Sequence, residues 1–461
     1  MSVEQAAPRR LPHPRYRLPV AGDLLSVDAD RPVQREMKMA DELGGIYERK
    51  IFGHRLVVVS DPELVTLVNN EDDWAKFLAL PHRKLRSLAG DGLFTAFNSE
   101  PSWQVAHSIL GPAFDKKAMR AYHYAMVQSL SGLVSSWDAA PEHHAIDAFT
   151  ESSKLAFDVI GQCALSHRFE SFEQPVPLAD AISRTLRYVN RTSNDIPLVR
   201  SVTGRGAARQ YRADIAMIRA SIDNLVTERI SRRIPAGTTD IIDHMLKTSD
   251  PRTGEALSTD SIRNQVLTFL IAGNETTAST IGFALHFLAE RPELVERLRL
   301  EIDEASPDGG PIEFETVAKL RGVRRTIDET LRLWPAAPGY FRKARSKDPV
   351  ALGGYTLPEN WVFVLLPQLH RSAGWGDDSH EFNPDRFAAD YPRSKDRVYK
   401  PWGTGLRACI GRQFALHESV LALAYILRRY DLTPAEGCRL DIREELTLRP
   451  HGVRLKVSRR T

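Results

Sequence analysis

One cysteine stands in a loop whose neighbours favour ionisation of its thiol. Cys409 lies in the stretch Trp402-Gly-Thr-Gly-Leu-Arg-Ala-Cys-Ile-Gly411, directly before the strongly helical segment 412–428. Glycines let the backbone pass close to a flat ligand, and the dipole of the following helix favours thiolate over thiol. With Arg407 nearby, a lone thiolate suits a metal that takes one axial protein ligand, such as haem iron. A buried core cysteine is the alternative, because free cysteine is among the most buried residue types.

A second stretch whose side chains could take part in catalysis lies inside the longest predicted helix. This helix opens at Ser258-Thr259-Asp260, any of which can serve as its cap, and it stops before Pro292. Its middle reads Ala272-Gly-Asn-Glu-Thr-Thr277, although a glycine inside a helix costs about 1 kcal/mol relative to alanine. The functional interpretation is a helix opened locally beside a ligand, where Glu275 and Thr276 handle protons. The structural alternative is a kink in which threonine bonds to the carbonyl four residues earlier.

Composition excludes several classes of protein. The 461 residues include 62 basic and 59 acidic side chains, and this balance gives no reason to expect a nucleic-acid partner. Hydrophobic residues make up 42% and charged residues 26%, as in ordinary soluble globular proteins. Cys163, Cys409 and Cys438 are odd in number and widely spaced, so neither a disulfide framework nor a zinc cluster is indicated.

The chain is expected to be a soluble cytoplasmic protein with no membrane anchor. Residues 1–19 are rich in proline and arginine and have no apolar core, so they are not a secretory signal. No window approaches the roughly 18 apolar residues that a membrane-spanning helix needs. A reducing compartment also fits the cysteine usage.

Helical periodicity dominates the middle of the chain. The predicted helices span 100–121, 145–161, 207–232, 260–290, 320–333 and 412–428. Strand-like hairpins stand at both ends, the first pairing 46–51 with 56–60 and the second pairing 445–449 with 453–457. No linker or repeat divides the sequence. It is therefore predicted to form one mainly α domain over 1–461 with small β-sheets, preceded by a flexible arm at 1–18 and without a fused reductase.

Four segments, in this order, resemble those of cytochromes P450: Ala272–Thr277, Glu329-Thr-Leu-Arg332, Phe382-Asn-Pro-Asp-Arg-Phe387 and Trp402–Gly411. The resemblance spans nearly the whole chain and is closest to bacterial fatty-acid hydroxylases whose haem domain is fused to a diflavin reductase. That closer likeness is carried by Pro32-Val-Gln, Ala89-Gly-Asp-Gly-Leu-Phe-Thr95, Leu333-Trp-Pro, Pro367-Gln-Leu-His-Arg371 and Gln413-Phe-Ala-Leu-His-Glu418. The resemblance implies the cytochrome P450 fold, in which a long central helix crosses the haem.

The resemblance also implies a set of haem-binding residues. Cys409 would be the axial thiolate of haem b, and Arg407 would pair with a haem propionate. Trp103 and His107, four residues apart on one helix face, match the pair that holds the propionates; a core seam is their alternative. The rest of the expected haem pocket consists of Trp402, Gly403, Ile410, Gly411 and Ala272.

Other matched residues would serve catalysis, substrate binding and structure. Thr276 and Glu275 match the pair that relays protons during activation of the co-substrate O2. Glu329, Arg332 and Arg386 resemble a buried ion-paired network, as opposed to an ordinary surface helix pair. The expected substrate pocket consists of Phe94, Ala272, Ala337 and His54, for which a plain core role is the alternative.

Three departures from the family pattern bear on function. Trp402 replaces the usual phenylalanine, and its N–H could reach the sulfur and alter the haem potential. His54 and Val58 replace the arginine and tyrosine that hold a fatty-acid carboxylate, although Arg55 is adjacent. A run of arginines falls where the family places its access lid, and it is either a solvated face or a site for an anionic or carrier-tethered substrate. The run consists of Arg184, Arg187, Arg191, Arg200, Arg205, Arg209 and Arg212.

The sequence therefore predicts a haem-thiolate monooxygenase acting on an apolar small molecule, either a fatty acid or a secondary-metabolite intermediate. Its electrons would come from a separate ferredoxin with its reductase, or from a flavodoxin-type protein. A basic docking face for that partner would consist of Lys116, Lys117, Arg120, Lys400 and Arg412. The alternatives are a non-catalytic haem-binding sensor or carrier and a non-haem helical enzyme in which Cys409 is structural.

Overall fold

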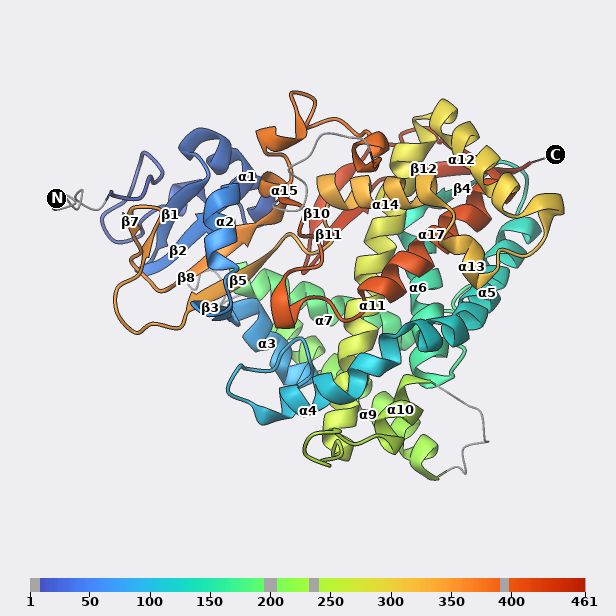
Figure 1. Cartoon of the computed structure of the whole chain (residues 1–461), viewed down its shortest axis with the longest axis horizontal. Coiled ribbons are helices and arrows are strands. Elements are labelled where there is room, and N and C mark those ends of the chain that lie inside the picture. Colours follow the sequence, from blue (N-terminus) through green and yellow to red (C-terminus); the bar gives the residue numbers. More distant parts are fainter. Residues whose placement is uncertain (1–8, 195–204, 232–239, 390–397, 461) are drawn as a thin grey trace. The chain divides into compact units, whose positions relative to one another are not determined.

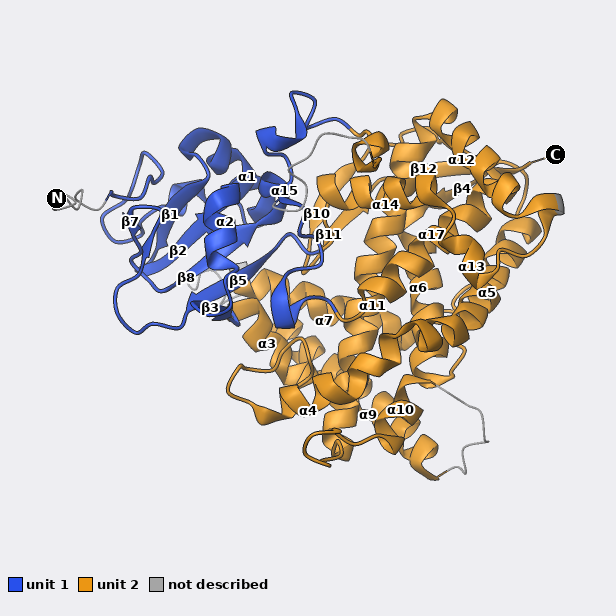
Figure 2. Cartoon of the chain, in the orientation of Figure 1, with its two compact units in different colours: residues 1–79, 337–381, 390–409 blue, residues 80–336, 382–389, 410–461 orange. Residues whose placement is uncertain are grey.

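The computed structural model describes residues 9–194, 205–231, 240–389 and 398–460, and the chain divides into two compact units (Figures 1 and 2). Unit 1 consists of residues 1–79, 337–381 and 390–409, and unit 2 of residues 80–336, 382–389 and 410–461. Three segments far apart in the sequence thus build each unit. The predicted class, mainly α with small sheets, is confirmed.

Unit 1 is built on a five-stranded sheet with the order β1-β2-β8-β5-β3. Its strands are β1 (Ile46–Ile51), β2 (His54–Val59), β8 (Trp361–Leu365), β5 (Gly339–Ala344) and β3 (Trp74–Lys76). The predicted first hairpin is confirmed, because β1 and β2 pair antiparallel around a turn at 52–53. The first core layer contains Met39, Ala40, Tyr47, Val58 and Leu365.

Smaller elements complete unit 1. They are the helices α1 (Pro32–Leu43), α2 (Pro62–Val68) and α15 (Leu366–Leu369) and the strand pair β6 (Ala351–Leu352) and β7 (Tyr355–Thr356). Residues 9–18 of the predicted N-terminal arm contact the body of the unit. Arg9 N donates a hydrogen bond to Gly354 O at 2.9 Å, and Glu48 N donates one to Pro12 O at 2.8 Å. The first eight residues of that arm lie outside the described part of the chain.

Unit 2 is the helical body. Its helices are α3 (Leu80–Ala89), α4 (Pro101–Leu110), α5 (Lys116–Ala139), α6 (Ala148–Leu165), α7 (Pro177–Asn194), α9 (Arg205–Ser231), α10 (Ile241–Lys247), α11 (Thr259–Ala289), α12 (Pro292–Ala305), α13 (Phe314–Val317), α14 (Arg321–Leu333) and α17 (Arg412–Arg429). The long central helix is confirmed as α11, 31 residues long and capped by Ser258, whose hydroxyl accepts from Ser261 N. It packs against α6, α14, α17 and α3 (Figure 1).

The predicted helix 100–121 is wrong, because two helices occupy this stretch. Pro112 lacks the N–H that a continuing helix needs, and residues 111–114 form a 3-10 turn instead. Asp115 then caps α5 by accepting a hydrogen bond from Ala118 N. The predicted helix 145–161 also begins too early, because β4 (His144–Asp147) precedes α6.

The predicted closing hairpin is wrong as well. Strand β11 (Leu448–His451) pairs with β10 (Asp441–Glu444), whereas β12 (Arg454–Arg459) lies between β4 and β9 (Tyr430–Pro434) in another sheet. The two stretches that the sequence suggests as partners therefore belong to different sheets. Strand β11 packs against α11.

Candidate functional site

The cysteine loop of unit 1 is held by its own backbone and by one carboxylate. Cys409 N donates to Trp402 O at 2.8 Å, which closes the loop, and Gly403 and Gly405 have φ of 70° and 65°. The carboxylate of Glu71 accepts from Leu406 N at 3.0 and 3.1 Å. A Cβ on Gly405 would lie 2.2 Å from that carboxyl group, so only glycine fits there.

Cys409 is the exposed one of the three cysteines, whereas Cys163 is buried and Cys438 is half-buried. A buried core role for Cys409 is therefore excluded. The indole N–H of Trp402 was expected to reach the Cys409 sulfur, but it does not. Its Nε1 is buried and has no hydrogen-bond partner in the described part of the chain. A buried donor without an acceptor is costly, so this atom fits a site completed by a bound group.

A cluster of three cations in the same unit was missed by the sequence reasoning. Lys76 on β3 and Arg342 on β5 are direct cross-strand partners. Burial, together with the positive charges of Arg407 and then Arg342, lowers the pKa of Lys76 to about 7. Arg342 donates to Thr404 Oγ1 at 2.7 Å, so it is held against the cysteine loop. Glu71 Oε1 lies 4.0 Å from Arg342 Nη1, and the three cations outnumber this one carboxylate. The excess of positive charge favours a further anion, such as the carboxylates that haem carries.

Trp103 and His107, the pair that the sequence resemblance assigns to the haem propionates, lie in unit 2. On α4 the rings of Trp103 and His107 stack with centroids 4.7 Å apart and planes inclined by 27°. Trp103 is 8% exposed, so its packing also serves the core. The geometry places the two rings on one helix face, as their spacing predicts.

The predicted local opening of α11 is wrong. The helix is continuous, and Thr276 Oγ1 donates to Ala272 O at 2.6 Å, which is the structural alternative. Gly273 is explained by packing, because a Cβ there would lie 3.2 Å from Ile160 Cγ1 on α6. Within 265–288, which the structure describes throughout, Ala272, Gly273 and Thr276 are the three residues that are not buried. The accessible strip of α11 therefore coincides with the motif.

Glu275 does not share that strip. Its side chain is 2% exposed in total and accepts a 3.0 Å hydrogen bond from Thr447 Oγ1. Arg449 on β11 forms an ion pair with the same carboxylate. Burial, with Arg187 nearby, lowers the pKa of Arg449 to about 9, so the guanidinium remains charged at neutral pH. The two expected proton-handling side chains are thus adjacent in sequence but bound to different partners.

The structure brings Glu329, Arg332 and Arg386 together, all three fully buried. Arg332 donates to both carboxylate oxygens of Glu329, at 2.6 and 2.8 Å, and Arg386 Nε lies 3.4 Å from Glu329 Oε1. Asn383 N adds a 2.8 Å hydrogen bond. The network ties α14 to the 382–389 segment.

The expected substrate residues divide between the units. Phe94, 37% exposed, packs edge-on against His82 with centroids 5.1 Å apart in unit 2. In unit 1, Ala337 and His54 are exposed, whereas Val58 is buried in the core.

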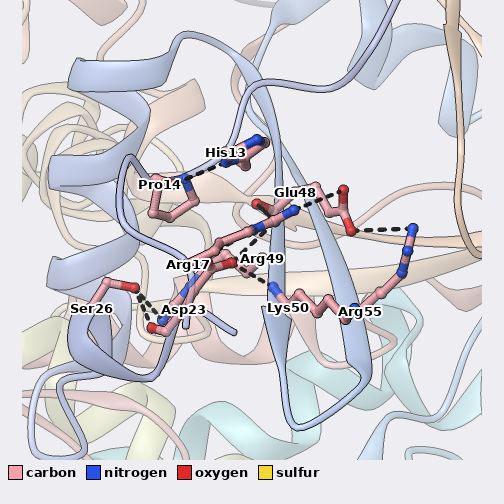
Figure 3. A network of polar contacts seen from close by, with 9 residues as sticks. All are labelled: His13, Pro14, Arg17, Asp23, Ser26, Glu48, Arg49, Lys50 and Arg55. Carbon is pink, nitrogen blue, oxygen red and sulfur yellow. Dashed lines mark hydrogen bonds and ion pairs between the residues drawn. The ribbon is translucent and has the colours of Figure 1, made fainter. Parts of the chain in front are cut away.

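Arg55, the remaining cation of the first hairpin, pairs with Glu48 at 3.4 Å (Figure 3). Glu48 lies 3.7 Å from Arg17, which also binds Asp23 through Nε at 2.9 Å. Asp23 in turn accepts from Lys50 N at 2.7 Å. Arg55, the cation next to His54, is therefore engaged in a network of internal ion pairs.

Two of the clustered arginines also have carboxylate partners. Arg184 binds Asp214 at 2.8 Å, and Arg187 lies 3.2 Å from Glu445. Arg200 lies outside the described residues. Of the expected docking face, Arg120 pairs with Glu315, while Lys116 and Lys117 are exposed at the start of α5.

Comparisons with known proteins identify the family of this chain. The family model described as Cytochrome P450 matches residues 12–457. A protein of Bacillus cereus named bifunctional cytochrome P450/NADPH–P450 reductase is 36% identical over 97% of this chain and 42% of its own length. A self-sufficient cytochrome P450 monooxygenase of Phanerodontia chrysosporium is 33% identical over 94% of this chain and 41% of its own length. The chain thus spans about two fifths of the length of these curated relatives.

A solved structure gives the same result for the fold. A crystal structure titled as a cytochrome P450, CYP102L1, superposes with a TM-score of 0.88 at 41% identity, covering 98% of this chain and all of that one. The expected fold is therefore confirmed. In the described part of this chain, no helix has the length and apolar character needed to cross a bilayer.

Proposed function

Because the chain belongs to the cytochrome P450 family, we propose that it is a haem-thiolate monooxygenase that hydroxylates or epoxidises an apolar small molecule. The observation that carries the proposal is the exposed Cys409 in a glycine loop beside the cationic cluster of Lys76, Arg342 and Arg407. When bound, haem b supplies the redox chemistry by which one oxygen atom of O2 enters the substrate and the other leaves as water, with two electrons and two protons consumed.

The residues of the loop have separate tasks in this proposal. Cys409 ligates the iron as a thiolate, and Trp402 gains an acceptor for its buried N–H. Lys76, Arg342 and Arg407 would hold a propionate, whose negative charge would offset their mutual repulsion.

Thr276 and Glu275 are proposed to manage protons. The Thr276 hydroxyl lies on the accessible strip of α11 and can exchange its bond to Ala272 O for one to a reacting oxygen. Glu275, the preceding residue, is buried, and Arg449 and Thr447 hold its carboxylate in place. A carboxylate and a hydroxyl together can pass protons while excluding bulk water.

The substrate is proposed to be bound mainly by apolar contact. Arg55 is already paired with Glu48, and Val58 lies in the core, so the first hairpin favours an apolar molecule over one held by its carboxylate. Spectral titration with dodecanoic acid, dodecanol and polycyclic natural products tests this, because tighter binding of the acid than of the alcohol would contradict it. Product identification by mass spectrometry then establishes the reaction.

Electrons are proposed to come from a ferredoxin or flavodoxin-type protein that docks on the basic residues at the start of α5. Lys116 and Lys117 are exposed there, and a cationic patch steers an acidic partner. The reduction rate should fall as salt rises, and a rate independent of salt contradicts the docking proposal. A sensor or carrier, the alternative function, would show no substrate-dependent oxygen consumption with such a donor.

A further inference from the structure

A chain of alternating charges runs inward through unit 2 from α7 to α11. Arg187 Nε on α7 lies 3.2 Å from Glu445 Oε1, and Glu445 Oε2 lies 2.9 Å from Arg449 Nη1. The other arm of the Arg449 guanidinium, Nη2, pairs with Glu275. The exposed fraction of these side chains falls along the chain from 60% to 14%, 10% and 2%. One guanidinium is thus shared between two carboxylates.

Additional contacts fix this arrangement. Thr447 Oγ1 donates to the second oxygen of Glu275 at 3.0 Å, and Asn190 Nδ2, one turn after Arg187 on α7, donates to Glu444 O at 3.0 Å. Residues 444–449, from the end of β10 to the start of β11, therefore contact α7 on one side and Glu275 on the other.

Among the described residues, the side chain of Glu275 has Thr447 and Arg449 as its hydrogen-bond and ion-pair partners. Charged groups on other elements packed against α11 have partners of their own: Asp158 with Ser171 and Lys154 with Glu151 on α6, Arg332 with Glu329 on α14, and Arg86 with Glu100 and Lys84 with Thr192 on α3. Glu418 on α17 is buried, and burial raises its pKa well above the ordinary value, so its charge is suppressed.

We propose that Glu445 and Arg187 are positioning residues that set how strongly Arg449 holds Glu275, and thereby how readily Glu275 exchanges a proton. The inference rests on the proposed proton role of Glu275. The negative charge of Glu445 competes for Arg449 and so favours protonation of Glu275, whereas Arg187 weakens that competition by neutralising Glu445. The two residues therefore act on Glu275 in opposite directions, and Arg187 does so through its contact with Glu445.

The test is the pH profile of product formed per NADPH consumed, measured on the haem-loaded full chain with dodecanol, which does not ionise in this range, as the probe. Glu445→Gln should move the acid limb of the profile to lower pH by about one unit, and Arg187→Gln should move it to higher pH by a similar amount. The double variant should follow Glu445→Gln, and Arg187→Lys should restore the original profile. Arg184→Gln, one turn earlier on α7 and paired with Asp214, is the matched control and should leave the profile unchanged.

A second readout does not depend on turnover. In urea unfolding, Glu275→Gln should change the unfolding equilibrium constant by a factor that differs severalfold between the unaltered protein and Arg187→Gln protein. This coupling between Arg187 and Glu275 should vanish when Glu445 is also replaced by glutamine. Additive shifts, or zero coupling between Arg187 and Glu275, overturn the positioning role. If Glu275→Gln instead leaves product per NADPH unchanged while the unfolding coupling persists, the proposed proton role fails and the positioning role stands.

Discussion

Lys76 and Arg342 are direct partners on the neighbouring strands β3 and β5, and burial, followed by the positive charges of Arg407 and Arg342, lowers the pKa of Lys76. The sheet of unit 1 thus brings like charges together beside the loop that carries Cys409. Such an arrangement is unfavourable in the chain alone and favourable once an anion joins it.

Replacing Lys76 with methionine should therefore stabilise the haem-free protein and weaken its haem binding. The pKa of Lys76 falls from 10.5 to about 7 on folding, so between these pH values the folded state binds fewer protons than the unfolded state. The lysine therefore destabilises the fold most at pH 7 and below, and this effect fades as the pH rises toward 10.5. Thermal unfolding at pH 7.5 and 9.5 checks this, with the larger gain, on the order of a few kcal/mol, at pH 7.5. Lys38→Met on the exposed face of α1 is the control, and equal gains at both sites would contradict the account.

Breaking the buried network of Glu329 should destabilise unit 2 strongly. Glu329→Ala leaves Arg332 and Arg386 buried without their shared carboxylate, at a cost of about 3–5 kcal/mol. Asp385→Ala removes the exposed pair with Arg297 on the same segment and should cost under about 1 kcal/mol. Urea denaturation of the two variants measures the difference, and similar midpoints would show that the network contributes little.

Thr276→Val should uncouple electron use from product formation. Valine keeps the shape of the side chain but removes the hydroxyl that bonds to Ala272 O, so product per NADPH should fall about tenfold or more while Thr276→Ser retains it. Thr280→Val is a close control, because Thr280 makes the same bond four residues back, to Thr276 O, but is buried. A loss of coupling at Thr280 as large as at Thr276 would point to a helix effect.

Trp402→Phe should lower the reduction potential of the haem-loaded protein. The buried indole N–H has no acceptor in the described chain, and a bond to the bound thiolate would withdraw electron density from the iron. Losing a hydrogen bond of about 1 kcal/mol corresponds to a shift of about 40 mV for one electron. Spectroelectrochemical titration of both proteins gives the value, and an unchanged potential rejects a role for this N–H.

Features of this chain that depend on residues close together in the sequence could be predicted from the sequence. The ends of α11 could be predicted because the Ser258 cap and the Pro292 stop are local signals. The end of a helix at Pro112 is also a local signal. It was missed because the helical spacing of apolar residues continues on both sides of the proline.

Pairings between distant segments could not be predicted in the same way. Lys76 and Arg342 meet only through strand pairing, and neither stands in a motif. Likewise, Glu275 is readable as an acid in an apolar helix, but its partner Arg449 comes from a strand assigned to the wrong pairing. The chemistry of single residues is therefore visible in the sequence, whereas the partners that tune it depend on tertiary structure.

The central claim, that Cys409 ligates haem iron as a thiolate, is tested most directly by the absorption spectrum of the reduced, carbon-monoxide-bound protein. The account predicts the long-wavelength Soret band characteristic of a thiolate ligand, its loss in Cys409→His protein, and its retention in Cys438→Ser protein, where a less exposed cysteine is changed. A reduced complex without that band in the unaltered protein, or a band that survives replacement of Cys409, would contradict it.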